Sequence, residues 1–144
     1  MKNISKLKDL TQTTYDSVEG YRKAIEKADS PALRSALDQR LSRRQQTLAK
    51  LNTALTNNGE KTINDASMTG SAHQLFTSIA DAFESDDEAA VERVEEGEDY
   101  ISGQFRDALK DDDIDAALRP IFEDAYSEIR DGERFSDMLE KQYA

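Results

Sequence analysis

Long amphipathic segments dominate this chain and limit it to a helical bundle. Apolar side chains recur at spacings of three and four over stretches of about 25 residues, the pattern of helices that pack along one face. Only two prolines and six glycines occur among the 144 residues. The pattern predicts long helices at about 3–28, 31–57, 87–109 and 113–141, and a short helix at about 70–84. We therefore expect a single all-α domain that spans residues 1–144.

The ends of these helices have recognisable signals. Ser30 and Pro31 fit the start of the second helix, because serine caps helix N-termini and proline is tolerated in the first turn. Residues 57–59, Asn-Asn-Gly, fit its C-terminal end. Pro120 is expected either to kink the last helix or to mark its start.

The lengths of the connections predict the topology. Short joints link the first helix to the second and the third to the fourth, so each pair should form an antiparallel hairpin. The stretch from Thr56 to Asp86 is long enough to run along the bundle, as the one-crossover ferritin-like topology requires. The competing arrangement is an up-down bundle with a side excursion.

Composition excludes several classes of function. A net charge of −11 disfavours nucleic acids and anionic membranes, because both carry dense negative charge. The absence of cysteine excludes disulfides and thiolate metal sites. The N-terminus lacks the apolar run of a signal peptide, and no stretch is apolar enough to cross a bilayer. We expect a soluble cytoplasmic protein.

Two features could serve association with a partner. Residues 31–57 carry a charge balance of +4, whereas residues 84–115 carry −11. The two helices could be neighbours, or the surplus acid could simply face water; alternatively, the acidic face meets a basic protein or another subunit. Exposed apolar residues such as Leu10, Leu75 or Tyr143 could alternatively join two copies into a homodimer.

Three short words in the sequence occur together in a known family. They are Asp16, Gly20, Tyr21 and Ala24 in the first helix, residues 68–73 before the short helix, and residues 95–99 in the third. From about Ile4 to Leu139 the chain resembles a family of small bacterial proteins known as a four-helix-bundle domain of unknown function and grouped with the ferritin-like proteins. The resemblance implies the crossover topology, a bacterial source and no established activity. Related two-helix-repeat proteins are linked to stress responses.

The residues of a ferritin-type dinuclear centre are missing. Such a centre takes a Glu from each of two helices and a Glu-x-x-His pair from each of the other two. The one histidine is His73, Gly70 stands three positions before it, and residues 31–57 contain no Glu. We therefore expect no cofactor, no catalytic site and a non-catalytic interaction or stress-associated protein. The alternative is a bundle that binds or stores metal with carboxylates alone, for which the candidate ligands are Glu19, Glu95, Glu98 and Glu128.

Two charged residues occupy core positions of the apolar pattern instead. Arg44 falls in the core pattern of the second helix and Glu98 in that of the third, both near mid-helix. We expect them to form a buried ion pair, joined by Thr14 or Tyr21, since bidentate pairing would satisfy both groups. The alternative is that Arg44 lies at the helix edge and extends its head into solvent.

Two further motifs have ordinary explanations. His73 could act as a base or ligand, but without a cysteine or serine partner we expect it to cap or pack at the start of a helix. The acidic run at 111–115 is similar to the start of a calcium loop, yet Ala116 and Phe122 stand where that loop needs Gly and Glu. Helix capping explains the aspartates better. Phosphate-binding loops and nucleophile elbows are absent from the sequence.

Overall fold

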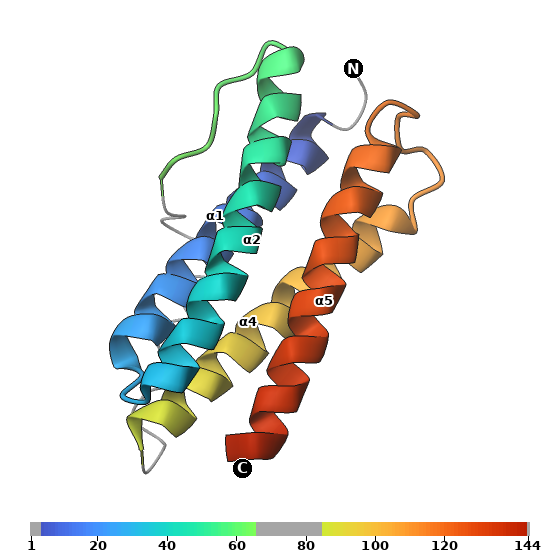
Figure 1. Cartoon of the computed structure of the whole chain (residues 1–144). Helices are drawn as coiled ribbons and strands as arrows, with labels where there is room; N and C mark the ends of the chain where they lie inside the picture. The colour runs from blue at the N-terminus through green and yellow to red at the C-terminus, as the bar shows by residue number, and fades with distance from the viewer. Residues whose placement is uncertain (1–3, 66–84, 144) are drawn as a thin grey trace.

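The protein is an all-α four-helix bundle (Figure 1). The computed structural model describes residues 4–65 and 85–143. The helices are α1 (Ile4–Lys27), α2 (Pro31–Asn57), α4 (Asp86–Leu109) and α5 (Arg119–Tyr143). The expected short helix at 70–84 lies outside the described residues.

Each helix is antiparallel to its neighbours, and one connection crosses the length of the bundle. α1 packs against α2 and α4, while α5 packs against α4 and, less extensively, against α2. In Figure 1, α2 ends at the top of the bundle and α4 begins at the bottom. The chain from Asn58 to Ser85 therefore joins opposite ends, as the expected one-crossover topology requires. The alternative of a side excursion is wrong.

Serine side chains cap the N-termini of two helices, at Ser30 as the sequence indicated and at Ser85. Ser30 Oγ accepts a hydrogen bond from the Leu33 amide at 3.3 Å, and Ser85 Oγ accepts one from the Glu88 amide at 3.0 Å. These bonds satisfy donors that the first turn of a helix leaves without partners. Gly59 follows α2 with φ of 77°, a conformation that favours glycine. The signals at residues 30 and 57–59 therefore act at the two ends of α2.

The last helix begins at Arg119, later than the expected residue 113. Residues 111–118 form turns instead, in which Asp111 and Asp115 side chains accept hydrogen bonds from backbone amides two residues ahead, both at 2.9 Å. Such local bonds compete with helix formation. Pro120 sits in the first turn of α5, so of its two expected roles it marks the start of the helix.

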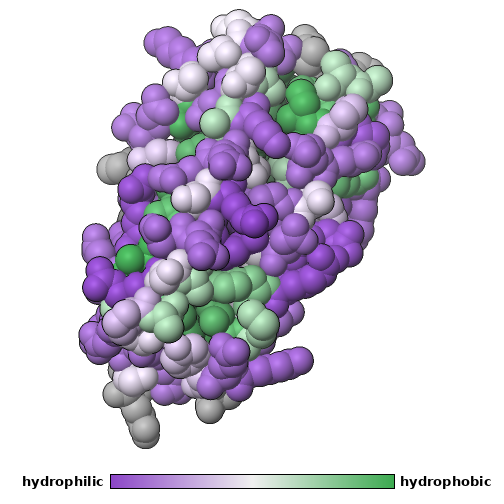
Figure 2. All heavy atoms as spheres, in the orientation of Figure 1, coloured by the Kyte–Doolittle hydropathy of each residue, from purple (hydrophilic) through white to green (hydrophobic). Residues whose placement is uncertain are grey.

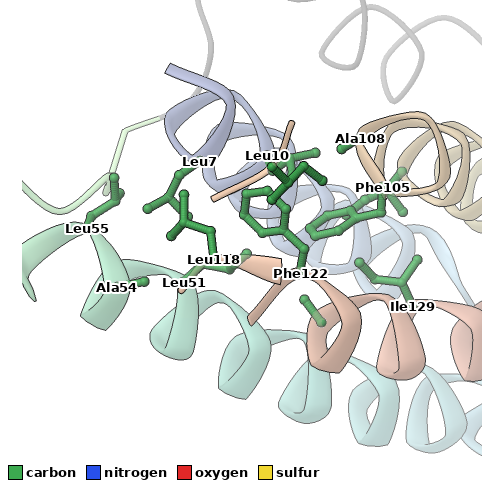
Figure 3. Packing of buried hydrophobic residues seen from close by; sticks show 13 residues of the cluster. Leu7, Leu10, Leu51, Ala54, Leu55, Phe105, Ala108, Leu118, Phe122 and Ile129 are labelled. Carbon is green, nitrogen blue, oxygen red and sulfur yellow. The ribbon is translucent and has the colours of Figure 1, made fainter. Parts of the chain in front are cut away.

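Two apolar clusters fill the bundle, one toward each end. In the first, leucines of α1 and α2 pack around Phe105 and Phe122 (Figure 3). The second contains Val18, Leu37 and Val94 with their neighbours. Burying each large apolar side chain contributes roughly 1.5–3 kcal/mol before entropy is counted. The two clusters are separate, and the buried polar residues Ser17 of α1, Arg44 of α2 and Glu98 of α4 lie between them along the sequence.

The beginning of the crossover is attached to the bundle by polar side chains. Asn52 of α2 donates to the Ile63 carbonyl at 3.3 Å and accepts from the Ile63 amide at 2.8 Å. Gln12 of α1 donates to the Asp65 carbonyl at 2.8 Å. The Asn52 side chain thus bonds to both the backbone N–H and the backbone C=O of Ile63, which attaches this segment to α2.

The large apolar side chains of the described residues are mostly buried. Figure 2 shows hydrophilic side chains over most of one face, with apolar side chains in smaller patches. Leu10 is 3 % exposed, so its expected role as an exposed contact is wrong. Tyr143 is half-buried, and Leu75 lies outside the described residues. Among the described residues, Met138 is the large apolar side chain that stands exposed, at 52 %. None of the described helices is long and apolar enough to span a lipid bilayer.

Candidate functional site

Arg44 lies at the centre of the bundle with all five of its N–H donors engaged. Its side chain is 0 % exposed. Nη1 donates to Ser17 Oγ at 2.6 Å and to Glu98 Oε1 at 2.7 Å. Nη2 donates to Glu98 Oε2 at 2.8 Å and to Glu128 Oε2 at 3.2 Å, and Nε donates to Glu128 Oε1 at 2.8 Å. A guanidinium has five donors, so none is left for a further ligand.

One carboxylate comes from α5, which packs against α2, and the other from α4, which packs against α1 and α5. Glu98 of α4 is 1 % exposed and accepts the Arg44 fork in the bidentate geometry expected from the sequence. Glu128 of α5 also accepts from Arg40 Nη2 at 2.6 Å and from Thr47 Oγ1 at 2.7 Å. We call Arg40, Arg44, Glu98 and Glu128, with Ser17 and Thr47, the central network. The alternative in which Arg44 reaches solvent is wrong.

The linking groups on α1 differ from those expected. Thr14 is buried, but its hydroxyl donates to the Leu10 carbonyl of its own helix at 2.8 Å. The Tyr21 ring lies under the guanidinium, 5.7 Å from Cζ of Arg44 to the ring centre, at cation–π distance. Its buried hydroxyl has no hydrogen-bond partner within the described chain. Ser17, one turn from both, supplies the hydrogen bond instead.

The central network balances two cations against two carboxylates. Burial by itself would raise the pKa of Glu128, but the charge and hydrogen bonds of Arg44, Thr47 and Arg40 hold it below its ordinary value. Burial and the nearby Glu98 carboxylate raise the pKa of Tyr21 well above its ordinary value, so its hydroxyl stays neutral. Near neutral pH Glu128 therefore stays ionised and Tyr21 stays protonated.

Gly132 of α5 makes room for the network. A Cβ atom at this position would lie 1.9 Å from Glu98 Oε2, 2.8 Å from Arg44 Nη2 and 3.1 Å from Arg40 Nη2. Glycine is needed here for close approach, because its conformation in the middle of α5 is ordinary helix. Any other residue would displace the ion pair.

The four carboxylates of the metal-binding alternative are not brought together. Glu98 and Glu128 are occupied by Arg44, and Glu19 pairs with Arg22 of its own helix at 3.5 Å. Glu95 faces a different group, in which one carboxylate oxygen each of Glu95, Asp99 and Asp137 lie within 4.8 Å of one another. Among the described residues this is the one such group of three.

The remaining candidates have structural roles or lie outside the described chain. Asp111 pairs with Lys6 at 2.8 Å and accepts the turn hydrogen bond from Asp113, so the acidic run 111–115 closes a loop between two helices. His73 lies outside the described residues. The positive balance of 31–57 has a direct explanation, since Arg40 and Arg44 neutralise carboxylates of α4 and α5.

Sequence reasoning missed several members of the central network. Arg40 lies one turn before Arg44 on the same face of α2, which is a signal that the pattern offered. Gly132 lies at a core position of α5, but the apolar pattern does not indicate that charged side chains pack against it. The Glu95 group depends on how α4 and α5 are rotated against each other, which one sequence does not specify.

Comparisons with known proteins agree with this fold. The sequence profile of a family described as domain of unknown function DUF2383 matches residues 2–111. Among solved structures, YcfI from Rhodopseudomonas palustris, described as a proposed structural protein, is similar with a TM-score of 0.70 at 17 % identity. The likeness covers 92 % of this chain and 88 % of YcfI, and at this identity it shows the fold alone. No curated protein matches the sequence.

Proposed function

Because the chain belongs to the DUF2383 family, whose description gives no activity, we propose that it is a non-catalytic structural or interaction protein. The observation that carries the proposal is the burial of Arg44 at the bundle centre with all its donors engaged. In ferritin-like bundles the metal ions are held by inward carboxylates and histidines at the middle of the helices. Here that place holds a guanidinium whose donors are all used, and a cation there would be repelled by Arg44 and Arg40.

The surface around the network supports the same proposal. The hollow between α2 and α5 that reaches Glu128 has a volume of about 190 Å³ and is lined by polar and charged residues such as Thr47 and Asp131. Sites for small molecules and cofactors usually measure roughly 300–1,000 Å³ and are largely apolar. Glu128 itself is held ionised by two arginines, which makes it a poor general base at neutral pH.

The partner would be another protein or a second copy of the chain. A net charge of −11 disfavours nucleic acid and anionic lipid. Because Met138 is the large apolar side chain that stands exposed among the described residues, we expect the contact to be polar and its strength to fall with added salt. The described structural role of YcfI, a protein of similar fold, is consistent with such a function. The cytoplasmic location and the stress association stay predictions.

Metal content tests the proposal against the carboxylate-only alternative. The full chain would be purified without chelators, incubated with ferrous iron or manganese, freed of excess metal and analysed for its elements. We expect less than about one-tenth of an equivalent per chain, since the central carboxylates are already neutralised. Glu98→Gln and Glu123→Gln serve as a matched pair, because Glu123 is exposed on α5 away from the network. One or two equivalents that only Glu98→Gln abolishes would overturn the proposal.

A further inference from the structure

Acidic side chains face one another along the contact between α4 and α5. Glu95 and Asp99 of α4 meet Asp137 of α5, with one oxygen of each within 4.8 Å of the other two. Other carboxylates on both helices lie close enough to raise the pKa values of Glu92, Glu95 and Asp99. We call the whole set the acidic seam: Glu92, Glu95, Glu96 and Asp99 on α4, and Glu133, Asp137 and Glu140 on α5.

The acidic seam has no cationic partner in residues 4–65 and 85–143. No Lys or Arg of this described part forms an ion pair with any of its seven carboxylates. The nearby neutral groups are serines: Ser102 donates to Glu133 Oε1 at 3.3 Å, and Ser136 donates to the Glu133 carbonyl at 2.9 Å. One oxygen, Glu95 Oε2, is buried without any hydrogen-bond partner in the described chain. Burying this oxygen costs free energy while the carboxylate is ionised, and less when the carboxylate shares a proton with a neighbouring carboxylate.

The electrostatics agree with this geometry. Burial, followed by the charges of Asp99, Asp137 and Glu140, raises the pKa of Glu95 to about 8. Burial, followed by the charge of Glu133, raises the pKa of Asp99 to about 6. Burial and the neighbouring Glu96 also raise the pKa of Glu92. The seam therefore retains protons at a pH at which ordinary surface carboxylates have lost them.

We propose that the acidic seam is a pH-operated latch between α4 and α5, closed while its carboxylates share protons and loosened when all of them ionise. Glu92, Glu95 and Asp99 have a higher proton affinity in the folded chain than in the unfolded chain, since their pKa values are raised. Their stabilising effect is therefore complete at low pH and is lost as pH rises through about 6 and then about 8. α5 is the helix we expect to loosen, because it packs mainly on α4 and less extensively on α2.

Thermal unfolding of the full chain at a series of pH values tests the latch. EDTA is kept in excess, so that protons are the only ligand. Between pH 5.5 and 8.5 we expect the Tm of the natural chain to fall by about 5 °C or more. Glu95→Gln, which mimics a permanently neutral side chain, should reduce this fall by at least about half. Hydrogen exchange should show that α5 amides lose protection first as the pH rises.

Two further variants keep the test decisive. Glu123→Gln makes the same chemical change on α5 outside the seam, and it leaves every other titrating group in place, His73 included. It should follow the natural chain. Asp99→Asn is the second variant within the seam and should also flatten the dependence, mainly below pH 7. A Tm that stays constant or rises with pH, or that falls equally in Glu95→Gln and Glu123→Gln, would overturn the latch.

Discussion

Replacing Gly132 with alanine adds one methyl group where the central network leaves no space. The new Cβ would lie 1.9 Å from Glu98 Oε2 and 2.8 Å from Arg44 Nη2, both closer than non-bonded atoms approach. Gly132 stands in the middle of α5, and both contacting groups are almost completely buried. Glu98 and Arg44 must therefore move apart, although the tips of their side chains are flexible.

The expected magnitude follows from two opposing terms. Alanine is a better helix former than glycine by up to about 1 kcal/mol, which by itself would stabilise α5. Displacing Glu98 Oε2 leaves a buried charged donor of Arg44 without its partner, and such losses cost about 1–3 kcal/mol each or more when charge is involved. We expect the network term to exceed the helix term. Gly132→Ala should be destabilised by about 1–3 kcal/mol.

Gly103→Ala is the matched control for this substitution. Gly103 is also within a helix, but a Cβ there would meet only Arg106 Nη2 at 3.7 Å, an ordinary contact. This variant should gain up to about 1 kcal/mol from helix propensity alone. Urea unfolding followed by the helical circular dichroism signal measures both, and Gly132→Ala should lower the midpoint by roughly 1 M.

The double variant Gly132→Ala with Glu98→Ala identifies the cause. If the methyl group acts through Glu98, its cost should be much smaller once the Glu98 side chain is gone, so the two effects should not add. Equal stabilisation of Gly132→Ala and Gly103→Ala would refute the reasoning, because it would mean that the ion pair yields to the methyl group without loss.

Three other predictions concern the network and the crossover. Arg44→Lys should lower the free energy of unfolding in urea by roughly 2–4 kcal/mol, since an ammonium cannot make five planar hydrogen bonds. Lys50→Ala breaks an exposed pair with Asp124 and should cost less than about 1 kcal/mol. Equal costs would contradict the buried network. Glu128 has a lowered pKa, so its contribution to stability is present above its ordinary pKa of 4.5 and is lost as pH falls. Glu128→Gln should therefore reduce the loss of stability between about pH 5 and 3. An unchanged loss of stability at acidic pH would count against the pairing. Asn52→Ala removes both bonds to Ile63 and should speed proteolysis near residue 63 with little change in global unfolding; cleavage at the natural rate would show that these bonds do not hold the segment.

The sequence could predict the central pair because polarity at a core position is informative. Arg44 and Glu98 interrupt apolar patterns near the middle of two helices, and a buried charge needs an opposite charge nearby. The choice of hydroxyl on α1 could not be predicted. Thr14 and Ser17 lie three residues apart on one face, and only the rotation of the helix decides which one meets the guanidinium.

The start of α5 shows a second limit. The aspartates before Pro120 were compatible with a first helical turn rich in acid, as the helix dipole favours. They were equally compatible with the turns that residues 111–118 form. Both uses satisfy backbone amides with the same side-chain oxygens, so local sequence leaves them close in free energy and tertiary packing decides between them.

The central network and the acidic seam are expected to change in stability in opposite directions as pH changes. The network is stabilised by the ionised Glu128 carboxylate beside two arginines, so this contribution weakens as the solution becomes acidic. The seam consists of carboxylates without cations, so it weakens as the solution becomes basic. α5 takes part in both, through Glu128 and Asp137. α5 is held mainly by its apolar side chains in both clusters, and its polar contacts with α2 and with α4 are expected to depend on pH in opposite directions. The two contacts can be weakened separately by moving the pH in opposite directions.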